Sequence, residues 1–167
     1  MLELKPLSKE AIPGALDRAV RYRLLNDPWQ AESICHDILK AEPDNQKAML
    51  TIILSITDQF GTRLGANPSK ALEMVSQLKD EYQRDYYKGI VYERQATAAL
   101  KRDNPRSEYI AYGYLREAME CYERAEKSHA TENEESILRY NACVRMINQH
   151  KLKPAPDEEG LQPFLDV

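Results

Sequence analysis

The sequence has few glycines and no long apolar run, and each shortage excludes a class of protein. Only 6 of its 167 residues are glycine, and β-branched residues are scattered. No stretch alternates apolar and polar residues for the length of a strand. The longest apolar run, residues 48–56, is interrupted by Thr51 and Ser55 and is too short to cross a membrane. We therefore expect neither a sheet nor a membrane-spanning segment.

Cysteine is scarce as well. Cys35, Cys121 and Cys143 are an odd number without a Cys-x2-Cys pair, which is typical of proteins in a reducing compartment. Residues 1–11 contain no apolar signal core. The sequence thus predicts a cytoplasmic protein that needs no disulfide, structural metal or cofactor.

Neither sign of charge dominates. The chain has 23 basic and 27 acidic residues, a formal net charge of −4, which argues against general affinity for nucleic acid or anionic membranes. With 43% hydrophobic and 30% charged residues, a disordered chain is excluded. The length fits about one domain. We expect a helical domain over residues 1–150 and an acidic, proline-rich tail over residues 151–167.

Helix-forming residues fill most of the chain, so the predicted fold class is all-α. The pairs Asp27-Pro28, Asn67-Pro68 and Asn104-Pro105 each indicate a helix start, because the polar side chain accepts from free N–H groups and proline needs no partner there. These breakers and others divide the chain into seven predicted helices, at residues 8–26, 28–42, 45–60, 68–83, 85–102, 106–129 and 133–150.

An apolar pattern recurs within these predicted helices. A small residue is followed four positions later by a larger one and three positions after that by another apolar one. This spacing keeps all three on one helix face, where the small residue allows a neighbouring helix to approach closely. The triplets are Ala31, Cys35 and Ile38; Ala71, Val75 and Leu78; and Ala118, Tyr122 and Ala125.

The first triplet and the turn at residues 43–45 resemble the second helix and closing turn of a tetratricopeptide repeat. Ala19 with Tyr22, and Gly89 with Tyr92, are similar to part of the family's first helix. Successive triplets begin 40 and 47 residues apart instead of 34, so longer repeats of the HEAT or armadillo kind stay open. The resemblance implies a right-handed array of antiparallel helix pairs, a TPR-like α-solenoid.

The resemblance also implies a function. In that family the first helices of successive repeats line a concave groove that holds a peptide or partner helix. We therefore expect a non-enzymatic protein-interaction module, and the cations, tyrosine and aliphatic residues at the implied positions suit an acidic, partly apolar peptide. A secretion or assembly chaperone is one alternative, and a helical enzyme or small-ligand-binding domain is another. The implied groove residues are Arg23, Lys47, Leu54, Tyr86, Ile90, Arg94 and Arg139.

Two short motifs have residue types used in catalysis or metal binding. In Cys35-His36-Asp37, consecutive helical residues point about 100° apart and cannot orient one another. Glu126-x2-His129 has the spacing of di-metal carboxylate sites, but no second copy exists. The phosphate-binding glycine loops and the nucleophile elbow are also missing. We expect no catalytic or metal site.

The basic residues Lys101, Arg102 and Arg106 lie near several tyrosines, which is the best nucleic-acid candidate. Acidic residues around them leave the segment nearly neutral, so a solvated helix junction is the better interpretation and no nucleic-acid partner is expected. Tyr122 is expected in the core because it belongs to a triplet.

The tail combines acidic residues with three apolar ones, Leu161, Phe164 and Leu165. Apolar side chains gain free energy when they leave water. We therefore expect the tail to dock on the helical array, either on its own chain or on a second copy as a homodimer.

Overall fold

The computed structural model describes residues 1–62, 66–102, 104–128 and 134–156. This part of the chain contains seven α-helices and no strand, so the predicted all-α class is confirmed. A short 3-10 helix, η1, precedes the first of them. The bounds are η1 Lys9–Ala11, α1 Ile12–Leu24, α2 Pro28–Ala41, α3 Gln46–Asp58, α4 Pro68–Ser76, α5 Glu81–Leu100, α6 Ser107–Ser128 and α7 Glu135–His150.

Four helices begin at a short polar side chain that accepts a hydrogen bond from a free backbone N–H group. Pro28 and Pro68 follow two of these caps and occupy positions where an N–H group would have no partner. The polar-proline pairs therefore mark the starts of α2 and α4, as predicted. The caps are Asp27 for α2, Asn45 for α3, Asn67 for α4 and Asp80 for α5.

Helix α1 is shorter at both ends than the predicted span of 8–26. It starts late because Pro13 has no N–H group to extend the helical bonds backwards. It ends early because Asn26 adopts a left-handed conformation, with φ of 62°. The N–H group of Asp27 then donates to the carbonyl of Tyr22 at 2.9 Å, which closes the helix in a Schellman motif.

The predicted boundary between the fourth and fifth helices, at residue 84, is wrong. The break lies at residues 77–80 and contains neither glycine nor proline. Asp80 caps α5 with its side chain, and Nη1 of Arg84 donates to the carbonyl of Leu78 at 2.7 Å. Side-chain hydrogen bonds thus end one helix and start the next without a residue that breaks helices.

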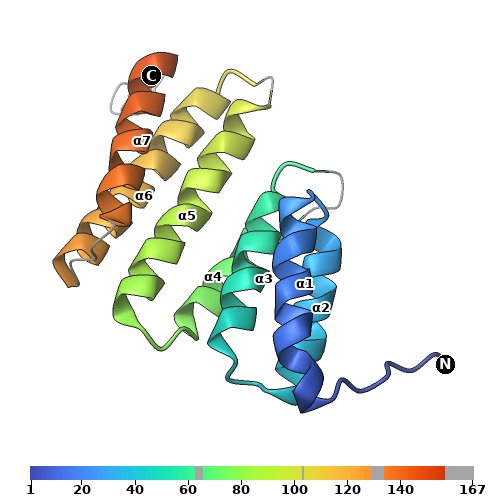
Figure 1. Ribbon diagram of the computed structural model, residues 1–167. Helices are drawn as coiled ribbons and strands as arrows, with labels where there is room; N and C mark the ends of the chain where they lie inside the picture. Colours follow the sequence, from blue (N-terminus) through green and yellow to red (C-terminus); the bar gives the residue numbers. More distant parts are fainter. Residues whose placement is uncertain (63–65, 103, 129–133, 157–167) are drawn as a thin grey trace, which may run out of the picture.

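The helices form two layers (Figure 1). Each helix packs on the next one in sequence, and α1 also contacts α3, which contacts α5. On the other side, Nζ of Lys70 in α4 lies 2.8 Å from Oε1 of Glu32 in α2. The odd-numbered helices α1, α3 and α5 therefore lie side by side, with α2 and α4 behind them.

Two apolar cores fill the space between the layers. The first joins α1–α4 with Val91 and Ala98 of α5, and the second joins α5, α6 and α7 with Leu152. Tyr87 of α5 packs against both cores. All nine residues of the three recurring triplets are buried, as their spacing predicts.

Candidate partner-binding groove

The residues that the resemblance placed in a groove come from the odd-numbered helices. Arg23 lies on α1, Lys47 and Leu54 on α3, Arg139 on α7, and the other three on α5. Tyr86 and Ile90 are buried, Lys47 is exposed, and Arg23, Leu54, Arg94 and Arg139 are half-buried.

Two of the expected groove cations share one carboxylate. Nε of Arg23 lies 2.6 Å from Oδ2 of Asp58, and Nη1 of Arg94 lies 3.7 Å from Oδ1. Asp58 is the last residue of α3, so this cluster joins α1, α3 and α5. Because two guanidinium groups face one carboxylate, the cluster keeps one excess positive charge.

Arg139 belongs to a different, more buried network. Its Nη1 donates to Oε1 of Glu93 at 3.0 Å, and the hydroxyl of Tyr122 donates to Oε2 at 2.6 Å. Burial, and then the charge of Glu93, raise the pKa of Tyr122, so its hydroxyl keeps the proton that it donates. Burial would lower the pKa of Arg139, but Glu93, Tyr86 and Tyr122 together outweigh it and the pKa is raised. The network therefore holds α5, α6 and α7 together.

Tyr86 and Ile90 contribute to packing instead of lining an open surface. The ring of Tyr86 stacks on that of Tyr82 with centroids 5.6 Å apart, and it meets Tyr87 edge to face at 5.2 Å. Ile90 lies in the second core and is 3% exposed. Of the seven implied residues, Lys47 also lines a cavity between α1 and α3.

A cavity of about 650 Å³ lies between α1 and α3. Apolar side chains of both helices line it, and Lys9 and Lys47 stand beside Asp17 and Glu42 among its charged residues. Val20 on its rim is 48% exposed, and Leu24, one turn further along the same face, is 78% exposed. We call this cavity the α1–α3 groove. Its apolar residues are Ile12, Pro13, Leu16, Val20 and Leu50.

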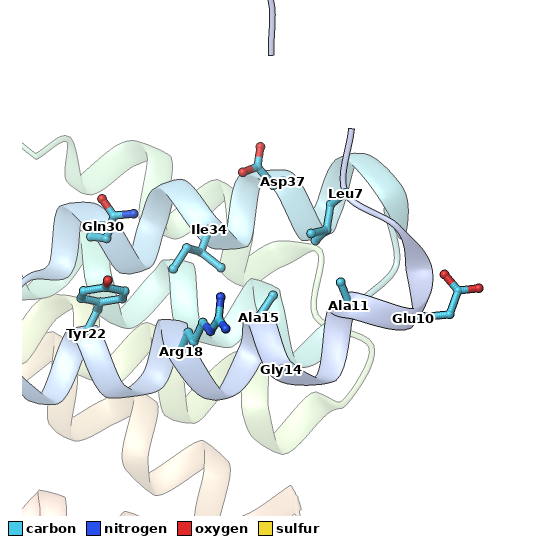
Figure 2. Close-up of a pocket in the computed structure, with 10 residues that line it drawn as sticks. All are labelled: Leu7, Glu10, Ala11, Gly14, Ala15, Arg18, Tyr22, Gln30, Ile34 and Asp37. Atoms are coloured by element: carbon cyan, nitrogen blue, oxygen red, sulfur yellow. The ribbon is translucent and has the colours of Figure 1, made fainter. Parts of the chain in front are cut away.

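A second cavity of about 470 Å³ opens between α1 and α2 (Figure 2). Tyr22 faces Gln30 at one end, and Leu7 and Ala11 lie toward the other end. Arg18 lies between these ends, and Asp37 lies on the opposite helix. The lining contains no cysteine, serine or histidine, and its titratable side chains are those of Glu10, Arg18, Tyr22 and Asp37.

Of the motif Cys35-His36-Asp37, Asp37 lines the cavity between α1 and α2, and Cys35 and His36 do not. Cys35 is buried, and burial raises the pKa of its thiol to about 12. His36 is exposed and faces Glu32 at 3.4 Å. His129 lies outside the described residues, so the Glu126–His129 pair has no described geometry. Among the described residues, no group of three or more potential ligands is arranged to hold a metal ion.

The sequence interpretation missed most of the groove. Leu16, Val20 and Leu24 follow one another at four-residue spacing, which is the signal that would have found them on one helix face. Their partner Leu50 lies one turn before the implied Leu54 on α3.

Comparison with family models, with characterised proteins and with solved structures finds no match to this chain. Within the described residues, no helix has the length and apolar character needed to span a bilayer. The resemblance to tetratricopeptide repeats therefore rests on the residues quoted for it.

Proposed function

We propose that this chain is a protein-interaction module that binds a peptide or partner helix in the α1–α3 groove. The observation that carries the proposal is the apolar lining of the groove, with Leu16 and Val20 on α1 and Leu50 on α3, continued by the exposed Leu24 one turn beyond Val20. Such a lining can receive the apolar face of a helix or extended peptide. Contiguous exposed apolar patches often mark interaction sites.

The contacts between alternate helices support a repeat architecture for this module. In a tetratricopeptide-like array, the first helices of successive pairs line one face, and here α1, α3 and α5 lie side by side. The buried triplets lie on α2, on α4 with Leu78 just after its end, and on α6, and they fit the second helices of such pairs. We propose a right-handed solenoid of this kind, with α7 as its closing helix.

The charged residues around the groove indicate the charge of the ligand that it would bind. Lys9 and Lys47 lie at one end, and the Asp58 cluster with its excess positive charge lies near the other. Asp17 and Glu42 balance the two lysines, so the Arg23–Arg94 end carries the net attraction for an acidic residue. The proposed ligand has apolar side chains in its centre and acidic ones beside them.

Selection from a displayed peptide library on the folded chain tests this function. We expect the selected peptides to be acidic and apolar, and to lose at least tenfold in affinity for the Val20→Glu variant. Leu138→Glu is the matched control, because Leu138 is 63% exposed on α7, away from the groove. Peptides that bind both variants as they bind the parent chain would contradict the proposal, as would a selection that yields no binders.

A further inference from the structure

We propose that the α1–α3 groove receives residues 157–167 of a second copy of this chain, so that two copies exchange tails as a dimer. This inference rests on the proposed function, because it names the ligand of the same groove. It starts from the sequence of the segment, which lies outside the described residues.

The segment carries all of the chain's excess negative charge. Residues 157–167 contain four carboxylates and no lysine or arginine, so the remaining 156 residues have 23 basic and 23 acidic side chains. The tail is therefore attracted to any surface of the body where cations exceed carboxylates. The cluster of Arg23, Arg94 and Asp58, which joins α1, α3 and α5, is such a surface.

The apolar residues of the segment match the length of the groove. Leu161 and Phe164 lie about 10 Å apart in an extended chain, at about 3.3 Å for each residue. Leu16 and Leu24 are eight helical residues apart, or about 12 Å. The side chains of Leu161 and Phe164 therefore fit along the apolar row of α1, beside Leu50 of α3.

The reach of the tail favours a second copy over the same chain. Helices α1 and α7 lie at opposite ends of the molecule (Figure 1), and three steps between packed helices cover about 24–30 Å. Leu152 is fixed in the second core, and nine residues from there to Leu161 span about 30 Å when fully extended. A straight path across α5 and α3 would bring the first apolar residue to α1 with about 6 Å of slack at most. A second copy has no such constraint.

Reciprocal exchange closes the assembly. If the tail of each copy enters the groove of the other, both binding sites are used and a two-fold dimer results. Effective concentration also favours the second contact once the first has formed. The dimer would bury the exposed Val20 and Leu24 side chains in both copies.

Sedimentation over a concentration series tests the proposal with the full chain, a form lacking residues 157–167, and the Val20→Glu and Leu138→Glu variants. We expect the full chain and Leu138→Glu to approach twice the 19.3 kDa chain mass, and the other two to stay monomeric. A synthetic peptide of residues 157–167 should bind the truncated form and bind its Val20→Glu variant at least tenfold more weakly. Circular dichroism checks that every variant is folded.

The outcomes separate this inference from the proposed function. If library peptides bind the groove but the full chain is monomeric and the tail peptide does not bind, the exchange is wrong and the groove proposal stands. If library peptides bind the truncated form more tightly than a monomeric full chain, the tail docks on its own chain and the exchange is again wrong. If no peptide is sensitive to Val20→Glu, both proposals are wrong.

Discussion

Gly89 is the residue that allows α5 and α6 to approach closely. A Cβ atom placed on Gly89 would lie 2.5 Å from Cε1 of Tyr122 and 2.9 Å from Cδ1 and Cζ. The Tyr122 ring has little freedom to move, because it is fully buried and its hydroxyl is bonded to Glu93. A side chain at residue 89 therefore conflicts with the buried network as well as with packing.

We predict that Gly89→Ala destabilises the chain by about 1–3 kcal/mol, because overpacking outweighs the gain in helix propensity. The matched control is Gly113→Ala in α6, where an added Cβ meets no atom within 4 Å. The free energy of unfolding of that variant should rise by about 0.5–1 kcal/mol, because alanine loses less backbone entropy than glycine when the chain folds. Chemical denaturation measures the free energy of unfolding of both variants. An equal increase in both would show that α5 and α6 do not pack through Gly89.

The three cysteines give a second test at the same scale. All are buried and free, and burial is the main cause that raises each pKa, to about 12 for Cys35 and Cys143. Because the thiolate is the reactive species, we predict slow modification by a thiol reagent at pH 8 and fast modification in denaturant. An added Ser69→Cys at an exposed residue sets the fast reference rate. Rapid labelling of Cys35 in the native chain would mean that α2 buries a different face.

At the scale of elements, the recurring triplets can be tested where α4 packs on its neighbours. Ala71 is fully buried, as its place at the start of a triplet predicts. We predict that Ala71→Leu costs about 1–3 kcal/mol through overpacking. Glu73→Leu adds the same side chain at an exposed residue of α4 and should change the denaturation midpoint little. Equal denaturation midpoints for both variants would show that α4 does not pack closely on its neighbours through Ala71.

Local signals in the sequence predicted most of these elements. A polar residue before proline determines where α2 and α4 start, and neither signal depends on distant parts of the chain. The break before α5 was missed because Asp80 and Arg84 act without glycine or proline. The spacing of apolar residues also predicted the buried faces correctly, because it can be recognised within a single helix.

The groove was harder to predict, because its character depends on contacts between residues far apart in sequence. Arg23 and Asp58 are 35 residues apart, and Glu93 and Arg139 are 46 apart. The sequence shows three arginines but not the carboxylates that pair with them. The family resemblance therefore implied free cations where the structure has ion pairs, and it omitted Leu16 and Val20.

Glu32 links three elements and gives a prediction for pH dependence. It lies on α2 and accepts from Nζ of Lys70 in α4 at 2.8 Å and from Nε2 of Gln59 after α3 at 3.0 Å. Burial alone would raise the pKa of Glu32, but these donors and His36 outweigh it and the pKa is lowered. The native state thus holds a proton on Glu32 less tightly than the unfolded state does.

It follows that Glu32 stabilises the fold above its unfolded pKa, about 4.3, and that this contribution is lost as the pH falls through the lower native value. We predict that Glu32→Gln costs about 0.5–1 kcal/mol at pH 7 and low salt, since the pair with Lys70 is partly exposed. The difference from the parent chain should shrink in acid. Glu73→Gln, at an exposed residue, is the control, and a loss independent of pH would show that the charge of Glu32 is not responsible.

At the scale of the whole molecule, two cores share one helix. Helices α1–α4 enclose the first core, α6 and α7 close the second, and α5 contributes residues to both. Contacts in such an arrangement are mostly between neighbours, so stability is divided along the chain. The groove belongs to α1 and α3 and thus to the first core, whereas the tail follows Leu152 of the second.

We therefore predict that a substitution in one core destabilises mainly the helices on the same side of α5. Ile52→Ala in the first core and Leu115→Ala in the second each remove a fully buried side chain, at a cost of about 2–5 kcal/mol. In native-state hydrogen exchange, Leu115→Ala should lower the free energy of opening in α6 and α7 by the full cost of the substitution. In α1 and α2 the free energy of opening should fall by less. Ile52→Ala should show the reverse order. Equal acceleration in all helices for both variants would mean that the molecule unfolds as one unit, and the division at α5 would be wrong.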